Sequence, residues 1–181
     1  MDSSSLREDD IIASDELARA LRQCLGHFAT GVAVVSYETA ASEARGLTVN
    51  SFTSVSLDPP LVLICLNKRS RAIEHLPRVP FAVNVLGADQ RDLAWHFAGK
   101  TTETRPIWRR VGNVPLLAQS LAWMTCEPWS NCDAGDHVIL IGHVQEFGVN
   151  QQDPLCFYRG EFIGIAPAEP LEPAAGKETT S

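Results

Sequence analysis

The sequence feature that most constrains the fold is residues 46–70, in which a polar strand leads through a proline turn into an apolar strand. Read with a period of two, the first strand places its polar side chains on the face that also carries Phe52. These polar side chains are Thr48, Asn50, Ser54 and Ser56. Asp58-Pro59-Pro60 then ends the strand, because proline fixes φ and donates no N–H. Polar groups on an inward face cost free energy unless they are hydrogen-bonded, so this face either holds a polar ligand or is half-exposed.

The second strand, residues 61–66, is fully apolar and leads into a turn that carries three cations and two small polar groups. This turn reads Asn67-Lys68-Arg69-Ser70-Arg71. A run of charges on a turn is commonly a solvated surface. Because it follows a hydroxyl-rich strand, the basic turn also suits a flat heteroaromatic ring that carries a phosphate group.

The other apolar segments are short, which favours a mainly β fold. Predicted strands cover residues 32–37, 81–86, 120–127 and 138–144, and residues 156–163 are a predicted hairpin. Many short strands with two or three peripheral helices predict a closed antiparallel β-barrel that forms a single domain.

Two helices and one long loop are expected around these strands. The first helix begins with Ser14 as its N-cap and is expected to bury one apolar face. That face is formed by Leu17, Leu21, Leu25 (or Cys24) and Phe28. The second helix runs from Asp89 to Gly99, and residues 100–117 are predicted to be an irregular binding loop or lid. Pro128 is expected to end strand pairing in its segment.

The composition predicts one folded domain over residues 14–166, with a disordered tail at residues 1–13 and a flexible tail at residues 167–181. The polar, acidic N-terminus is unlike a secretory signal, and no apolar run approaches the roughly 20 residues that span a bilayer. A cytoplasmic protein that does not bind a membrane is therefore expected.

Charge and cysteine content narrow the function further. Lys and Arg total 15 against 22 Asp and Glu, a formal charge of −7, which argues against nucleic-acid binding. None of the five cysteines has the two-residue spacing of a metal or redox motif, so no metal site is predicted. Cys24 and Cys65 lie in apolar runs and are interpreted as small core residues.

Six segments in order carry a resemblance that covers residues 17–165: GHFATGVAVVS, GLTVNSFTSVSLDPPLVLICLNKRS, FAVNVL, HFAGK, GDHVILIGHV and YRGEF. The chain resembles the flavin reductase family, the small components that supply reduced flavin to monooxygenases. The resemblance implies an FMN-binding split β-barrel of about six Greek-key strands that works as a homodimer, with flavin at the subunit interface. It also implies hydride transfer from NADH or NADPH to FMN or FAD, and a partner oxygenase.

Candidate site residues follow from the chemistry and from this resemblance. Hydride transfer takes place between the cofactors, so no side chain is assigned a catalytic role. The flavin-binding candidates are Thr48, Val49, Asn50, Ser51, Ser54, Ser56, Asn67, Arg69, Ser70, Ala98, Gly99 and Lys100. The candidates for binding the nicotinamide nucleotide are His137, Tyr158 and Arg159. Asp136 either orients His137 or is simply a turn residue, and Tyr158 could instead pack on the core.

Three other functions were weighed. A flavin-binding or storage protein on the same barrel would bind flavin without oxidising NADH. A pyridoxal-phosphate-type oxidase would need further arginines, and only Arg109 and Arg110 are unassigned. A haem-binding barrel would use His96 or His143. The sequence lacks the glycine-rich dinucleotide fingerprint and does not separate FMN from FAD, or NADH from NADPH.

Overall fold

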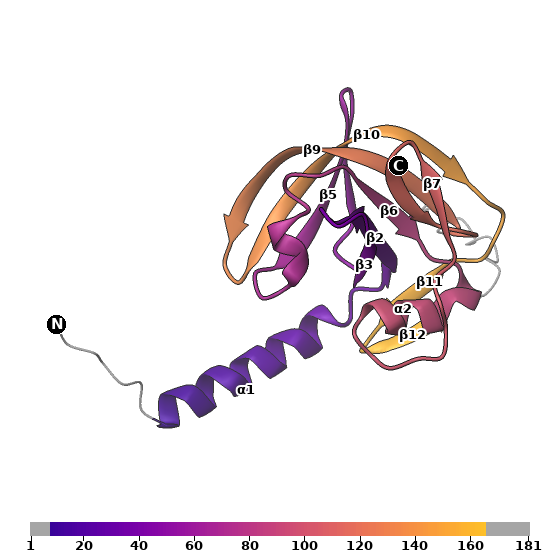
Figure 1. The fold of residues 1–181 in the computed structure, drawn as a ribbon. Coiled ribbons are helices and arrows are strands. Elements are labelled where there is room, and N and C mark those ends of the chain that lie inside the picture. The colour runs from indigo at the N-terminus through magenta and orange to yellow at the C-terminus, as the bar shows by residue number, and fades with distance from the viewer. Residues whose placement is uncertain (1–7, 166–181) are drawn as a thin grey trace, which may run out of the picture.

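The computed structural model describes residues 8–165, and Figure 1 shows a curled β-sheet with a long N-terminal helix extending away from it. This helix, α1, spans Glu8–Leu25. The prediction of an N-cap at Ser14 is wrong, because the helix begins six residues earlier with a first turn of acidic residues, which the helix dipole favours. The predicted tail at residues 1–13 overlaps the start of α1, and its first seven residues lie outside the described residues, as does the predicted tail at residues 167–181.

Seven strands form one antiparallel sheet in the order β3-β2-β6-β9-β10-β5-β4. Their bounds are β2 Ala33–Glu38, β3 Ala44–Val49, β4 Thr53–Leu57, β5 Pro60–Asn67, β6 Phe81–Val85, β9 Ala122–Ala134 and β10 His137–Val149. A three-stranded sheet contains β1 (Thr30–Gly31), β11 (Leu155–Tyr158) and β12 (Glu161–Gly164). The remaining elements are β7 (Trp108–Val111), β8 (Val114–Leu117), η1 (Arg71–Glu74), η2 (Ala88–Gln90) and α2 (Arg91–Phe97).

The single polar strand predicted over residues 46–56 is two strands on opposite edges of the large sheet. β3 ends at Val49 and β4 begins at Thr53, so the chain crosses between the edges within about 14 Å. The sheet must therefore curl, but no ladder among the described strands joins β3 to β4. The closed barrel expected from the strand pattern is therefore not formed by the described strands, and the mainly β split barrel that the family resemblance implied is confirmed.

Ser51 explains how the split is stabilised. Its hydroxyl accepts a hydrogen bond from the Cys65 N–H at 3.0 Å and donates one to the Cys65 carbonyl at 3.2 Å. The pairing of β4 with β5 stops at Leu63, so the serine side chain satisfies a backbone unit that has no β4 partner.

The core lies inside the curl of the sheet and is made of fully buried side chains, including Val35, Ile64, Phe81 and Leu140. Gly142 of β10 makes this packing possible. A Cβ atom at this position would lie 2.5 Å from Phe81 Cζ, which is closer than carbon atoms can approach. The aromatic ring therefore packs directly on the glycine backbone.

Residues 100–117 are not a continuous lid. Their second half forms the β7–β8 hairpin, and all four residues of β8 are buried. The overlooked signal is Gly112-Asn113 between apolar residues, where Gly112 has a φ of +55°. Asn84 fixes the hairpin, because its Oδ1 accepts from the Leu117 N–H at 2.9 Å.

Pro128 does not end β9. The register shifts between Pro128 and Ser130, so Trp129 is the extra residue of a bulge and is exposed. β6 pairs only with Ala122–Cys126 of β9, so beyond Cys126 only β10 lies beside the strand. The edge of β9 opposite β10 has no neighbouring strand at Pro128, so the missing N–H of the proline removes no hydrogen bond on that edge.

The apolar face of α1 is not buried within the chain. Leu17 is 71% exposed and Phe28 is 78% exposed, and Leu21, Leu25 and Cys24 are exposed as well. Cys65 is half-buried. The predicted burial of this face is therefore wrong for one chain, because α1 projects away from the sheet (Figure 1). Over residues 8–165, none of the helices has the length and apolar character needed to cross a membrane.

Candidate functional site

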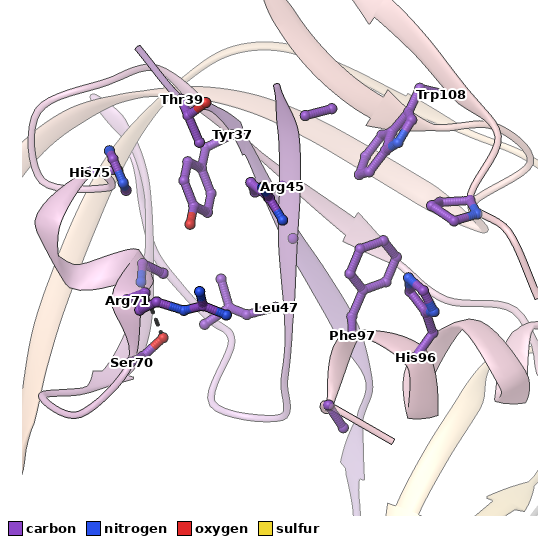
Figure 2. A pocket seen from close by; sticks show the side chains of 16 residues that line it. Tyr37, Thr39, Arg45, Leu47, Ser70, Arg71, His75, His96, Phe97 and Trp108 are labelled. Atoms are coloured by element: carbon purple, nitrogen blue, oxygen red, sulfur yellow. Dashed lines mark hydrogen bonds between the residues drawn. The ribbon is translucent and has the colours of Figure 1, made fainter. Parts of the chain in front are cut away.

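A hollow of about 570 Å³ lies between the β2–β3 hairpin, η1 and the end of α2. We call it the cationic hollow, because its walls carry two guanidinium groups and two imidazoles but no carboxylate. The polar side chains that define it are Arg45, Arg71, His75, His96, Tyr37 and Ser70. Figure 2 shows these side chains converging on the same space from three separate elements. Arg45 forms an ion pair with Glu43, which does not line the hollow, with 2.5 Å between Nη2 and Oε2. Arg71 is therefore the main cation of a set of donors that suits an anion.

Tyr37 adds a donor to this hollow. Its ring is only 5% exposed and stacks on the His75 imidazole, with ring centroids 5.5 Å apart. Figure 2 shows its hydroxyl directed into the hollow, toward Arg45 and Arg71. Burial raises the pKa of Tyr37, and the charges of Arg45 and Arg71 partly oppose that shift. The phenol therefore keeps its proton at neutral pH and can donate it to an anion.

A smaller hollow of about 180 Å³ adjoins the first and shares Ala98 with it. We call it the aromatic hollow, because Trp95, Phe157 and Phe162 line it opposite Thr48, Val49 and Asn50. The rings of Trp95 and Phe162 meet edge to face, with centroids 4.6 Å apart. An aromatic hollow next to a cationic one accommodates a flat ring joined to a phosphate.

Gly46 and Phe97 set the distance between α2 and the sheet beside these hollows. A Cβ atom at Gly46 would lie 2.8 Å from Cε1 of the Phe97 ring, so the ring packs against the bare strand backbone. This close approach fixes the C-terminal end of α2. Gly99 follows with a φ of +86°, as the predicted helix terminator requires.

Several predicted ligand-binding hydroxyls and amides are already hydrogen-bonded within the fold. Thr48 Oγ1 donates to the Ala94 carbonyl at 2.7 Å, which attaches α2 to β3. Asn67 Oδ1 accepts from the Arg69 N–H at 2.8 Å, and Ser56 Oγ accepts from the Asp58 N–H at 3.2 Å. Ser70 Oγ accepts from the Ala72 N–H at 3.3 Å, which leaves its own proton available for a ligand.

The structure brings together only part of the predicted flavin-binding set. Ser70, Ala98 and Gly99 line the cationic hollow, and Thr48, Val49, Asn50 and Ala98 line the aromatic hollow. Lys100 lies beside them, with its Nζ 3.3 Å from the centroid of the Trp95 ring. Arg69 is exposed on the turn after β5 and lines neither hollow.

Ser54 and Ser56 lie elsewhere. They line a third depression of about 270 Å³, the apolar hollow, together with Leu57, Trp123 and Phe147. Ser54 pairs with Val62 of β5, five residues from Asn67, and so lies about 17 Å from the basic turn. The structure therefore does not combine Ser54 with Ser70 in one phosphate site.

The predicted nucleotide-binding residues occupy two places. His137 pairs with Asn67 across β10 and β5, and its Nδ1 lies 2.7 Å from Asp136 Oδ1. This hydrogen bond lowers the pKa of Asp136, so the carboxylate stays ionised and orients the imidazole. Tyr158 and Arg159 lie at the β11–β12 turn, where the Tyr158 ring meets that of His27 edge to face.

Sequence reasoning missed most of the cationic hollow. Tyr37, Arg45, His75 and His96 were not among the predicted binding residues. A usable signal existed for one pair, because Tyr37 and Arg45 are direct cross-strand partners in the β2–β3 hairpin. His75 lines the cationic hollow only because η1 packs beside that hairpin. This packing cannot be predicted from a local sequence pattern.

A split β-barrel with adjoining aromatic and cationic hollows defines a class of small proteins suited to a phosphorylated, planar heterocycle. Residues 25–166 match the family described as "Flavin reductase like domain". The chain belongs to this family, as its motifs predicted.

Among curated proteins, the chain is 42% identical over 155 residues to a probable flavin reductase of Rhizobium meliloti. This alignment covers 80% of the chain but 48% of that relative, so the chain spans about half the relative's length. An NADH-dependent flavin reductase of Rhodococcus is 38% identical over 151 residues, covering 80% of the chain and 85% of the relative.

Solved structures agree with this assignment. The NADH:FAD oxidoreductase SgcE6 of Streptomyces globisporus, in complex with NAD and FAD fragments, superposes with a TM-score of 0.78 at 37% identity. That alignment covers 84% of this chain and 94% of SgcE6. The styrene monooxygenase flavin reductase of Pseudomonas putida gives a TM-score of 0.76 at 35% identity, covering 82% and 99%.

Proposed function

We propose that this protein is an NADH-dependent flavin reductase, which transfers a hydride from NADH to FMN or FAD and releases reduced flavin to a partner oxygenase. The observation that carries the proposal is the junction of the aromatic and cationic hollows at Ala98. Membership of the flavin reductase family supports it, as do relatives that are NADH-dependent flavin reductases.

In this function, the flavin supplies the hydride acceptor, and the chain binds and orients it. Trp95 and the backbone at Val49 and Asn50, at the end of β3, would hold its ring in the aromatic hollow. The phosphate lies in the cationic hollow, where Arg71 and Ser70 donate to its oxygens. No side chain needs to abstract a proton, because NADH delivers a hydride and water can supply the proton that reduced flavin takes up.

His137 positions the nicotinamide nucleotide. Its ring is held by Asp136 at the start of β10, directly across from Asn67, at the end of the strand that leads into the basic turn. An oriented imidazole there can donate to a carboxamide or pyrophosphate oxygen. Tyr158 and Arg159 belong to the hairpin that supplies Phe157 to the aromatic hollow, and they complete the nucleotide site from that side.

The protein works as a homodimer. Two apolar surfaces support this: the face of α1 at Leu17, Leu21 and Leu25, and the apolar hollow with Leu57 93% exposed and Phe147 75% exposed. A single leucine-faced helix in water is weakly stable, and a second copy would cover both surfaces under two-fold symmetry. Light scattering during gel filtration tests this, and a monomer at micromolar concentration would contradict it.

The partner is the oxygenase component of a two-component system. The styrene monooxygenase flavin reductase, whose alignment covers 82% of this chain, is named for such an enzyme. Reduced flavin that diffuses between the components requires no permanent complex, and the open hollows allow its release.

One experiment tests the central claim. The purified protein is mixed anaerobically with FMN or FAD, NADH is added, and absorbance is followed at the nicotinamide and flavin bands. Equimolar loss of NADH and oxidised flavin is expected. Flavin that binds but stays oxidised would instead indicate a storage or carrier protein.

A further inference from the structure

A fourth depression, which we call the outer hollow, continues the cationic hollow on the side away from Ala98. It measures about 410 Å³ and shares Thr39 and His75 with the cationic hollow. The aromatic, cationic and outer hollows are therefore neighbours in that order, sharing first Ala98 and then Thr39 and His75 as lining residues. In Figure 2, Thr39 and His75 lie at the opposite end of the cationic hollow from Ser70.

The size of the cationic hollow exceeds what one phosphate needs. A phosphate group displaces about three waters, on the order of 100 Å³, against the 570 Å³ available. Two guanidinium groups, Arg71 and the Glu43-paired Arg45, face this space together with the Tyr37 hydroxyl. Two cations and a neutral donor match a diphosphate, whose two charges are spread along its length.

The outer hollow has a different chemistry. Val79 and Pro80 give it an apolar wall beside the His75 imidazole, and its charged lining consists of the carboxylates of Glu38 and Glu74 and the guanidinium of Arg78. A carboxylate repels phosphate but accepts hydrogen bonds from ribose hydroxyls, and an imidazole beside apolar carbon suits a stacked purine. A phosphate is therefore favoured in the cationic hollow, and a neutral nucleoside in the outer one.

We propose that the outer hollow binds the adenosine of FAD, with the diphosphate in the cationic hollow, so that FAD is bound more tightly than FMN. This inference rests on the proposed function, because it assumes that the isoalloxazine occupies the aromatic hollow. It identifies His75, Glu74 and the wall at Val79–Pro80 as residues that determine flavin specificity.

Ala40 offers a direct test. It lies on the exposed turn between β2 and β3 and lines the outer hollow, whereas its neighbour Ala41 is exposed on the same turn and does not. Ala40→Trp should fill the hollow, and Ala41→Trp is the matched control. Dissociation constants for FAD and FMN are measured by flavin fluorescence, and thermal unfolding checks that both variants fold.

Wild-type protein should bind FAD more tightly than FMN. Ala40→Trp should weaken FAD binding roughly five- to hundredfold, the contribution of one stacked base, with FMN affinity unchanged. Ala41→Trp should change neither. Glu74→Gln should weaken FAD binding severalfold and leave FMN binding unchanged.

Three results would overturn the inference. Equal affinities of FAD for wild type and Ala40→Trp would exclude adenosine from the outer hollow. Parallel weakening of FMN and FAD would indicate a general distortion of the site. A raised KM for NADH with unchanged FAD affinity would place the adenosine of the nicotinamide nucleotide there instead. Failure of the proposed function is distinguishable, because these binding constants need no turnover.

Discussion

The two ends of β5 show how one strand serves two purposes. Its C-terminal end leads through Asn67 and Ser70 into the cationic hollow, which is polar and recessed. Its N-terminal end, at Pro60 and Leu61, borders the apolar hollow, where large apolar side chains remain exposed. The first end has the chemistry of a small anionic ligand, and the second has that of a protein surface. Serines near both ends were predicted to bind flavin, and the difference shows that residue type alone does not define a site.

The largest expected effect comes from removing the charge at the ligand end. Arg45→Ala combined with Arg71→Ala should weaken FAD binding by about 3 kcal/mol, or over a hundredfold, because two charge-assisted contacts are lost. Titration followed by flavin fluorescence measures this. The oligomeric state should not change. Loss of assembly with unchanged flavin binding would contradict the separate roles of the two ends of β5.

The converse change tests the apolar end. Leu57→Glu should weaken self-association by about 2 kcal/mol, since a side chain 93% exposed in one chain would be charged within an apolar interface. Light scattering at several protein concentrations measures the shift. Thr53→Glu, on the same exposed strand but not lining the apolar hollow, is the control. If the Leu57→Glu protein assembles like the wild type, the surface at Leu57 is not part of the dimer interface.

A third prediction concerns the nucleotide beside the ligand end. His137→Ala should raise the KM for NADH about tenfold, or 1.4 kcal/mol, while flavin affinity stays constant. Steady-state kinetics at saturating flavin provide the measurement. Equal losses in both would contradict a role in placing NADH.

The pH dependence of the same contact has a definite sign. Hydrogen bonding to His137 lowers the pKa of Asp136, so the contact persists above the ordinary pKa of a carboxyl. It is lost as the pH falls through the lowered value. The KM for NADH should therefore rise in that acidic range, and Asp136→Asn should remove this rise. If Asp136→Asn leaves the pH dependence of the KM unchanged, another group causes the rise at acidic pH.

The smallest expected effect comes from the same Ser→Ala substitution made near each end of β5, and this comparison separates the two ends most clearly. Ser70→Ala should weaken flavin binding by about 1 kcal/mol, because the hydroxyl lines the cationic hollow and retains a free proton. Ser54→Ala should have no effect on flavin, since its hydroxyl lies about 17 Å away by strand register. Equal losses of flavin affinity in the two variants would indicate that Ser54 and Ser70 bind the same flavin.

Local patterns were sufficient where neighbours in sequence decide the structure. The β11–β12 hairpin, the helix end at Gly99 and the apolar strand β5 were all predicted. They were predictable because turn residues and side-chain alternation act over a few residues. The bulge that accommodates Pro128 was missed, since it depends on which strands lie beside β9.

The sequence by itself determined that this chain is a mainly β flavin reductase relative with a basic turn after an apolar strand. Its motifs also predicted Thr48, Ser70, Ala98 and Gly99 as binding residues, and these residues line the aromatic and cationic hollows. Only the tertiary structure decided that β3 and β4 lie on opposite edges, and that Arg45, His75 and Tyr37 join Ser70. The physical reason is that hydrogen-bonding periodicity is local, whereas the curl of a sheet brings distant residues together through packing of the whole core.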